Sequence, residues 1–336
     1  QETTHFFEVL RNLKKEGYGI IIITHRMSEI MAISDKVTIL RDGKYVADAD
    51  VKDIELSWIV ENMVGKNTQY HRFERSIDLS KQPKVLEIKN MCLPKKGGGW
   101  TLDHVSLDLK KGEVLGVYGL LGAGRSELFE CLMGLHPEHT GDVLYEGKKL
   151  NIKDVAAQIK NGFALVPEDR QSQGLIQTLD IGKNTAISSM KDYVKGLFLD
   201  EKAENAAVDE QIKDIHIKVA DKRLPILSLS GGNQQKVVIG KGLLTKPKIL
   251  LLDEPSRGID IGAKKLVLEY LSKLNREQGM TVIIVSSELV ELRSISDRIA
   301  IISDGKLSRI LSPDAPDAEF GLAMSGTKVK GGEDHE

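Results

Sequence analysis

The stretch EVLGVYGLLGAGRSELFECLMG, residues 113–134, decides the fold of this chain. Its first seven residues form an apolar run that predicts a buried β-strand. Its last nine residues place leucine, phenylalanine and methionine side chains on one face of a helix. Between them lies the glycine-rich segment GLLGAGRS, residues 119–126. A strand, a glycine loop and a helix in this order are typical of a phosphate-binding loop, because glycines let backbone N–H groups turn towards an anion at the positive end of a helix.

The loop matches the pattern G-x-x-x-x-G-K-[ST] except that Arg125 replaces the lysine. A guanidinium is planar and bulky whereas an ammonium is a compact charge, so the replacement is not conservative. We expect nucleotide binding here, with Ser126 holding Mg²⁺, and the arginine weighs against fast catalysis. The alternative is a glycine-rich turn without a ligand. The candidate nucleotide-binding residues of the loop are Gly119, Gly122, Ala123, Gly124, Arg125, Ser126 and Glu127.

A second stretch, KILLLDEPSRGID at residues 248–260, is an apolar strand that ends in two acids. Asp253 is placed to bind Mg²⁺ through water, and Glu254 is placed to polarise an attacking water. Such an ending is common by itself. Here it follows the glycine loop by about 130 residues and precedes Pro255, which favours a catalytic interpretation.

A third stretch, LSLSGGNQQKVVIGKGLLTKP at residues 227–247, predicts a helix that begins at a Ser-Gly-Gly turn. Ser230, Gly231, Gly232 and Asn233 would offer N–H groups at the positive helix end, which makes a second anion-binding device in one domain. Two domains that face each other can use both devices on one nucleotide. The alternative is an ordinary serine N-cap.

An internal repeat organises the rest of the chain. Residues 17–44 and 279–306 align without gaps at an offset of 262, ending in the shared pattern SDxxxIxxDGK. Each copy predicts helix, apolar strand, short helix, apolar strand and Asp-Gly turn. In the first copy we expect the buried strand to be IIIITH, which ends at His25.

Composition excludes several classes. Lys and Arg total 47 against 49 Asp and Glu, a net charge of −2, which argues against a general nucleic-acid binder. No apolar run approaches the ~18 residues of a membrane-spanning helix. Cys92 and Cys131 have neither metal-ligand nor redox spacing and are expected to be core thiols.

The order of glycine loop, LSGGN, DEP and SSE resembles the nucleotide-binding domains of ABC transporters. More narrowly, GLLGAGRSEL, FALVPEDR, LSLSGGNQQKVVIGK and LLLDEPSRGIDIGAK are similar to the second half of the tandem ATPase of bacterial simple-sugar importers, such as those for ribose, galactose, xylose and arabinose. The resemblance implies an α/β P-loop NTPase fold of ABC type, with a mostly parallel sheet core, an antiparallel β subdomain and a helical subdomain.

The resemblance also implies roles. Glu168 stands where such domains carry a glutamine that contacts Mg²⁺ and the attacking water, and Asp260 lies in the loop that communicates between the ATPase halves. His25 occupies the position at which the first half of such ATPases carries a histidine that senses the γ-phosphate. At the equivalent position of the second copy this chain has Ser287. An aromatic residue that stacks on adenine is expected near residues 93–96; Trp100 is a possible substitute, with a strand anchor as the alternative.

These departures suggest that the second-half site holds nucleotide and turns it over slowly, while its Ser-Gly-Gly turn completes the first-half site. We expect a remnant of a first ABC ATPase domain at residues 1–65, a linker at 66–83, a complete second domain at 84–325 with a helical subdomain at about 185–245, and a disordered tail at 326–336.

The implied activity is an ATPase that uses ATP and Mg²⁺ to energise import of a simple sugar. Implied partners are a sugar permease in the membrane, indirectly a periplasmic or extracellular sugar-binding protein, and a second ATPase half or second copy, with no nucleic acid. The implied location is the cytoplasmic face of the inner membrane, as a peripheral subunit. Two alternatives are a non-catalytic nucleotide-binding interaction module and a non-transport ABC ATPase of translation or DNA repair.

Overall fold

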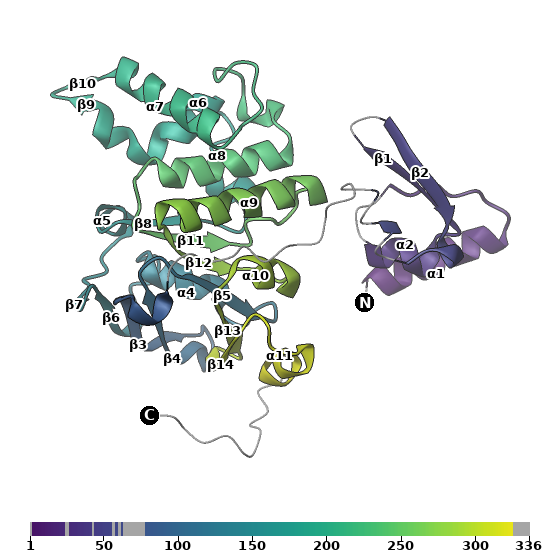
Figure 1. The fold of residues 1–336 in the computed structure, drawn as a ribbon, viewed down its shortest axis with the longest axis horizontal. Helices are drawn as coiled ribbons and strands as arrows, with labels where there is room; N and C mark the ends of the chain where they lie inside the picture. The colour runs from purple at the N-terminus through teal and green to yellow at the C-terminus, as the bar shows by residue number, and fades with distance from the viewer. Residues whose placement is uncertain are drawn as a thin grey trace. The chain divides into compact units, whose positions relative to one another are not determined.

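The computed structural model describes residues 2–23, 27–41, 44–55, 58–59, 62 and 78–324. The chain divides into two compact units, an N-terminal unit of residues Gln1–His71 with Asp260–Lys265 and a larger unit of residues Arg72–Ile259 with Leu266–Glu336. Figure 1 shows the elements of both. No helix in the described ranges is both long and apolar enough to cross a membrane.

Among its described residues the N-terminal unit holds helices α1 and α2, a short 3-10 helix and a two-stranded antiparallel sheet. Its small core gathers Ile30, Val37, Ile39, Val51 and Ile59. The elements are α1 (Glu2–Lys15), α2 (Met27–Ile33), β1 (Lys36–Arg41), β2 (Lys44–Asp50) and η1 (Val51–Asp53).

The prediction of a buried strand that ends at His25 is wrong for residues 20–23, the part of it that the structure describes. Residues 18–23 have no regular secondary structure, and Ile21 and Ile23 are 94% and 98% exposed. A β-strand needs a neighbour to pair its N–H and C=O groups, and in this unit β1 and β2, the strands that the structure describes, pair with each other. Thr24 and His25 lie outside the described residues, as does the expected tail at 326–336.

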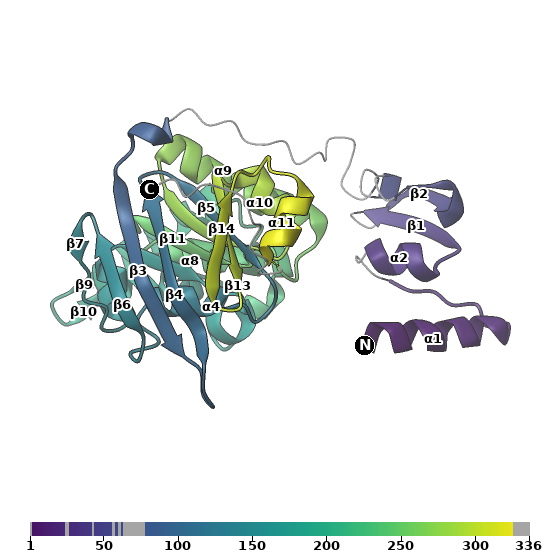
Figure 2. The ribbon, with the colours of Figure 1, turned by 90° about the horizontal axis from the view of Figure 1, so that it is seen from below.

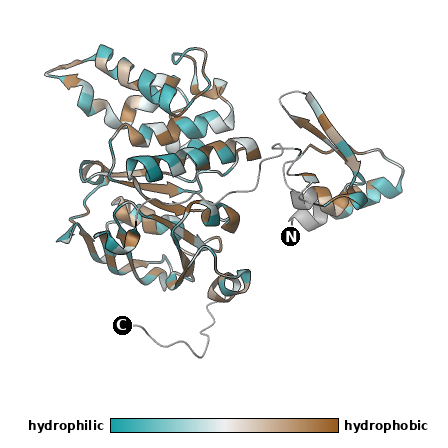
Figure 3. Cartoon of the chain, in the orientation of Figure 1, coloured by the Kyte–Doolittle hydropathy of each residue, from teal (hydrophilic) through white to brown (hydrophobic). Residues whose placement is uncertain are grey.

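The larger unit is built on two sheets, both within residues 78–324. The first has six strands in the order β14-β13-β5-β12-β11-β8, all parallel except the edge strand β14. Its strands are β5 (Val114–Gly119), β8 (Phe163–Val166), β11 (Ile249–Asp253), β12 (Thr281–Val285), β13 (Arg298–Ser303) and β14 (Lys306–Leu311). The central strands are buried and read as continuous apolar runs, as parallel strands covered on both faces do (Figure 3).

The second sheet is antiparallel, in the order β4-β3-β6-β7, and its two long strands stand out in Figure 2. They are β3 (Lys84–Pro94) and β4 (Trp100–Lys110), followed by β6 (Thr140–Tyr145) and β7 (Lys148–Lys149). The alternation in TLDHVSLDL predicts such a half-exposed sheet, and β4 shows it. These two sheets confirm the expected α/β fold with a parallel core and an antiparallel β subdomain.

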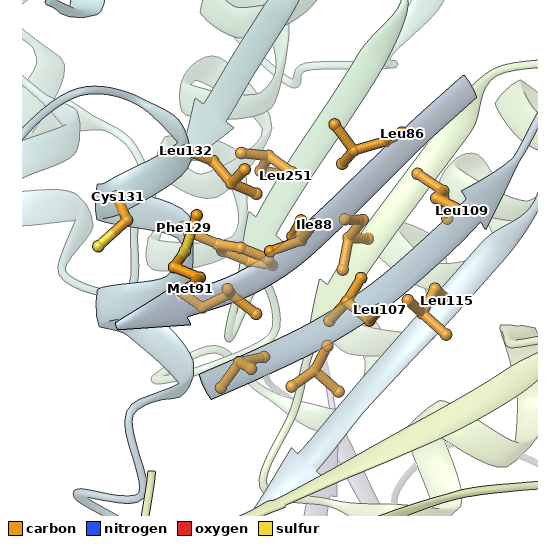
Figure 4. Packing of buried hydrophobic residues seen from close by; sticks show 14 of the residues in the cluster. Leu86, Ile88, Met91, Leu107, Leu109, Leu115, Phe129, Cys131, Leu132 and Leu251 are labelled. Atoms are coloured by element: carbon orange, nitrogen blue, oxygen red, sulfur yellow. The ribbon is translucent and has the colours of Figure 1, made fainter. Parts of the chain in front are cut away.

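The main core lies where α4 (Arg125–Leu132) contacts both β4 and strands β5 and β11 (Figure 4). Phe129, Leu132 and Leu251 are fully buried there. Cys92 and Cys131 are free and buried, as expected, and burial raises the pKa of Cys131 to about 12. The core therefore holds α4, and with it the glycine loop, against the end of the sheet.

The remaining helices and short strands lie between residues 79 and 324. Figure 1 shows α6, α7 and the β9–β10 hairpin together at one end of the larger unit, in the region where a helical subdomain is expected. The bounds are η2 (Leu79–Lys81), α5 (Val155–Lys160), the π-helical turn η3 (Arg170–Gly174), α6 (Ile181–Ala186), η4 (Ile187–Tyr193), β9 (Val194–Lys195), β10 (Phe198–Leu199), α7 (Glu201–Asp214), η5 (Ile226–Ser228), α8 (Gly231–Leu243), α9 (Ile261–Gln278), α10 (Leu289–Ile295) and α11 (Asp317–Met324).

Candidate functional site

The glycine loop leaves the carboxyl end of the central strand β5, which pairs in parallel with β12 and β13. Gly124 occupies the N-cap of α4 with φ +98°, a left-handed conformation that favours glycine. A Cβ on Gly124 would lie 2.7 Å from the Thr101 carbonyl oxygen, so a side chain has no room there. Glycine is therefore required for the chain to turn from strand into helix at this place.

Asp253, the last residue of β11, meets the start of α4 at Ser126. Its carboxyl group is 4% exposed, and burial raises its pKa to about 6, although a hydrogen bond with Ser126 and the charge of Arg125 act in the opposite direction. Its buried Oδ1 atom has no hydrogen-bond partner. A buried carboxylate oxygen without a partner, next to a hydroxyl, fits a divalent cation.

Within the described ranges no cluster of three or more His, Cys, Asp or Glu could hold a metal. A cation here would therefore take Ser126 and Asp253 from the protein and its other oxygens from a ligand or from water. That is the usual situation of Mg²⁺ bound together with phosphates.

Glu254 is held by two partners. Its Oε2 accepts a hydrogen bond of 3.1 Å from the Ser287 hydroxyl, and its Oε1 lies 3.4 Å from the Arg125 Nη1 atom, with both side chains of that ion pair 7% exposed. Burial raises the pKa of Glu254, against the effect of Ser287 and Arg125. The carboxylate expected to polarise water therefore faces the arginine that replaces the expected lysine.

Glu291 lies behind this cluster and has no role in the sequence-based prediction. It is fully buried, and its Oε2 accepts hydrogen bonds from Ser256 at 2.6 Å and Ser286 at 2.9 Å. It thereby links the segment after Glu254 to the residue before Ser287. The available signal was the repeat, in which Glu29 and Glu291 coincide.

The Ser-Gly-Gly turn forms the start of α8, as predicted. Ser230 is exposed at the N-cap position and makes no capping bond with its side chain, which instead accepts a hydrogen bond of 3.1 Å from the Asn233 amide. Asn233 in turn accepts a bond from the Lys218 N–H. Ser230 thus occupies the N-cap position without a side-chain capping bond, so its side chain does not block the positive end of the helix.

Glu168 and Asp260 contact residues outside the cluster of Arg125 and Glu254. Glu168 forms an ion pair with Arg257, just beyond Glu254 in the chain. Asp260 accepts a hydrogen bond of 2.9 Å from the Ala263 N–H at the start of α9. Trp100 is 48% exposed, and its ring meets His104 edge-on at 6.3 Å between centroids. The structure therefore brings five of the predicted residues together in one cluster and leaves Glu168, Asp260 and Trp100 outside it. The five are Arg125, Ser126, Asp253, Glu254 and Ser287.

Arg170 was missed as a site residue, although it ends the quoted motif FALVPEDR. Its guanidinium donates to the carbonyl oxygens of Arg257 at 3.0 Å and Gly258 at 3.3 Å, and lies 3.5 Å from the Gln234 amide oxygen in α8. It therefore connects the beginning of α8 with the segment that follows Glu254.

Comparison with known proteins agrees with this geometry. Residues 102–257, which contain the glycine loop, Ser230 and Glu254, match the model of the family described as ABC transporter. The chain carries an ABC transporter domain. The dimeric structure of the ATP-binding cassette MJ0796 in a post-hydrolysis state with ADP and Pi is similar to the chain, with a TM-score of 0.61 and 25% identity over 69% of this chain and 100% of that one.

Curated relatives extend the similarity beyond the ABC domain. The ribose import ATP-binding protein RbsA of Clostridium perfringens (strain 13 / Type A) is 40% identical over 95% of this chain and 62% of its own length. The galactose/methyl galactoside import ATP-binding protein MglA of Escherichia coli O157:H7 is 40% identical over 93% of this chain and 60% of its own length. The chain therefore spans less than two thirds of the relatives it matches.

Proposed function

We propose that this chain binds ATP with Mg²⁺ and, as an ATPase subunit, energises import of a simple sugar through a membrane permease. The observation that carries the proposal is the buried cluster around Arg125, Ser126, Asp253 and Glu254 at the end of β5 and β11, inside an ABC domain. The named activities of the ribose and galactose import relatives support the sugar-import part.

Each residue of the cluster has a task in this proposal. N–H groups of the glycine loop and the start of α4 bind the phosphates. Ser126 and Asp253 hold Mg²⁺, which supplies charge neutralisation of the phosphate oxygens when bound. Glu254 orients the attacking water and accepts its proton, and Ser287 holds the Glu254 carboxylate in place.

The site is expected to turn over slowly. Glu254 faces the Arg125 guanidinium at 3.4 Å, and this ion pair engages the carboxylate that has to accept a proton from the attacking water. Ser287 is not charged and cannot replace a histidine that senses a phosphate. The Ser230–Asn233 turn, whose helix end is open, would complete the faster site of a second ATPase half or second copy.

The remaining parts of the proposal concern assembly. Residues 1–65 would belong to a first ABC ATPase domain, and residues 84–325 form the second with its helical subdomain at about 185–245. The permease would bind the ATPase at the cytoplasmic face of the inner membrane, and a periplasmic or extracellular sugar-binding protein would take part indirectly. No nucleic-acid partner is proposed.

One observation favours a second candidate, a nucleotide-binding interaction module without turnover. The Arg125–Glu254 ion pair engages the general base inside the site itself. If the pair persists when nucleotide is bound, the domain holds ATP as a structural ligand only.

The two candidates separate in one set of measurements on the full chain. Trinitrophenyl-ATP fluorescence measures binding, and phosphate release measures turnover. We expect Asp253→Asn and Ser126→Ala to weaken Mg²⁺-dependent binding, and Glu254→Gln to abolish slow turnover while binding remains. The exposed Glu277→Gln is the control, since this side chain is 63% exposed. Binding without turnover selects the interaction module, and absence of binding overturns both.

A further inference from the structure

Arg170 occupies a place that the proposed reaction leaves without a task. It begins the π-helical turn Arg170–Gly174 that follows β8. Asp169 fixes this turn, because its carboxylate accepts hydrogen bonds from the N–H groups of Gln171 and Ser172 and from the Ser172 hydroxyl. The same bonds, the Ser172 hydroxyl first, lower the pKa of Asp169. The backbone that carries Arg170 is therefore well anchored.

The guanidinium bridges two segments that are far apart in the sequence. On one side its Nη1 and Nη2 atoms donate to the carbonyl oxygens of Arg257 and Gly258. On the other side its Nε faces the amide oxygen of Gln234. Gln234 is 7% exposed, and its amide nitrogen donates to the Leu229 carbonyl oxygen at 3.2 Å, directly before the Ser-Gly-Gly turn.

Two glycines make room for this arrangement. A Cβ on Gly231 would lie 2.9 Å from Nη2 of Arg170 and 3.4 Å from the Gly258 carbonyl oxygen. Gly258 has φ +68°, and a Cβ there would lie 3.3 Å from Nη1. A side chain at position 231 would therefore displace the Arg170 guanidinium from this position.

Glu168 strengthens the connection from two residues away, through its ion pair with the Arg257 side chain. Arg257 also donates its N–H to the Glu254 carbonyl oxygen at 2.9 Å. The segment after β8 therefore holds the Arg257–Gly258 turn by both side chain and backbone, one turn away from Glu254.

We propose that Arg170 is a positioning residue that couples the Ser230–Gly232 turn at the start of α8 to the Arg257–Gly258 turn after Glu254, so that the two turns open and close together. The coupling is a property of the fold, and only its consequence for turnover rests on the proposed function. A fork of N–H groups on two neighbouring carbonyls demands arginine, because a lysine ammonium cannot reproduce its planar geometry.

Hydrogen exchange of the nucleotide-free full chain, read by mass spectrometry, tests the coupling directly. The reporters are the Gln234 amide, bonded to the Ser230 carbonyl oxygen, and the Arg257 amide, bonded to the Glu254 carbonyl oxygen. We expect Arg170→Ala to speed exchange roughly tenfold in both segments. Arg170→Lys should do so nearly as much, and Gly231→Ala should give the same paired pattern.

The matched control is Arg223→Ala, which removes an exposed arginine that pairs with Asp221. It should change neither reporter. Acceleration in only one segment, no acceleration, or full rescue by Arg170→Lys would overturn the coupling. The lysine variant also guards against a loss of folding in the alanine variant.

A second readout connects the coupling to nucleotide. Arg170→Ala should leave the Kd for trinitrophenyl-ATP within about twofold, since its hydrogen-bond partners Gln234, Arg257 and Gly258 lie outside residues 119–126, and should lower kcat about tenfold. Equal effects on Kd and kcat would contradict a positioning role. If the unmodified chain binds no nucleotide, the proposed function fails while the exchange result still decides the coupling.

Discussion

The two copies of the repeat differ in the structure more than in the sequence. At the offset of 262, α2 coincides with α10, β1 with β13, and α1 falls within α9. Even the register agrees, because the β1–β2 ladder shifts between Ile39 and Leu40 and the β13–β14 ladder shifts between Ile301 and Ile302, the equivalent residues. Local pattern and turn chemistry are therefore enough to build these elements twice.

The apolar segment before the short helix behaves differently. In the larger unit it is β12, fully buried and paired on both sides with β5 and β11. In the N-terminal unit the equivalent residues 19–23 form no strand and are exposed. An apolar run supplies the tendency to form a strand, and neighbouring strands decide whether it becomes one. The comparison can be tested with pairs of matched variants.

The largest difference in the free energy of unfolding is expected when the central isoleucine of each segment is replaced by alanine. Ile283 is fully buried between Leu115 and Leu251, whereas its counterpart Ile21 is 94% exposed. Ile283→Ala should lower the free energy of unfolding by about 4 kcal/mol, through lost burial and a cavity. Ile21→Ala should leave it nearly unchanged. Urea denaturation followed by circular dichroism measures both, and equal losses would contradict the comparison.

The next largest difference in stability is expected for an ion pair that occurs at equivalent positions of the two copies. Arg276–Asp297 is largely buried, at 13% and 9% exposure, and Asp297 also accepts a hydrogen bond from the Val114 N–H. Its counterpart Lys14–Asp35 is 53% and 77% exposed. Arg276→Ala should destabilise by about 3 kcal/mol because it removes the positive charge that compensates the buried Asp297 carboxylate. Lys14→Ala should cost little, since water screens an exposed pair. Similar shifts in denaturation midpoint for the two variants would refute this difference.

The six-stranded sheet also buries the carboxyl group of Asp253 at the end of β11, and this makes the free energy of unfolding depend on pH. The pKa of Asp253 is about 6 in the folded chain, above its ordinary 3.8, so the folded state binds this proton more tightly than the unfolded state. The cost of the buried charge is full above pH 6 and disappears below about pH 4. Asp253→Asn should therefore stabilise by about 3 kcal/mol at pH 8 and by almost nothing at pH 4.

Thermal unfolding in a chelating buffer at both pH values measures the gain from Asp253→Asn. A gain of equal size at pH 4 and pH 8 would show that the buried charge of Asp253 is not its cause.

The smallest effect is expected at the position where the first copy has His25 and the second copy has Ser287. Combining Arg125→Lys with Ser287→His frees Glu254 from the guanidinium and supplies an imidazole, so turnover should rise about tenfold. Steady-state phosphate release measures it, with Arg125→Lys alone as the control. An unchanged rate would mean that these two residues do not limit the site.

Sequence reasoning predicts those candidate site residues that lie within one short segment. The glycine loop, the acids Asp253 and Glu254 at the end of β11 and the start of α8 are each contained in such a segment, so local patterns predict them. Arg170 was missed because its partner Arg257 lies 87 residues away in the chain, and no short pattern contains both ends of that bond. For Glu291 the bond to Ser256 spans 35 residues, whereas the bond to Ser286 spans only five. The buried strand predicted at residues 20–25 was wrong for residues 20–23 because the pattern says nothing about its neighbours.

The sequence by itself determined the strand, loop and helix of residues 113–134 and, in each repeat copy, the short helix and the apolar strand that follows it, because short-range sterics and apolar periodicity govern them. Only the tertiary structure decided which apolar run is a buried strand, that the Arg125 guanidinium faces Glu254, and that Arg170 joins two distant turns. These outcomes depend on strand pairing and packing between residues remote in the chain, where hydrogen bonds and desolvation are set by the assembled neighbours.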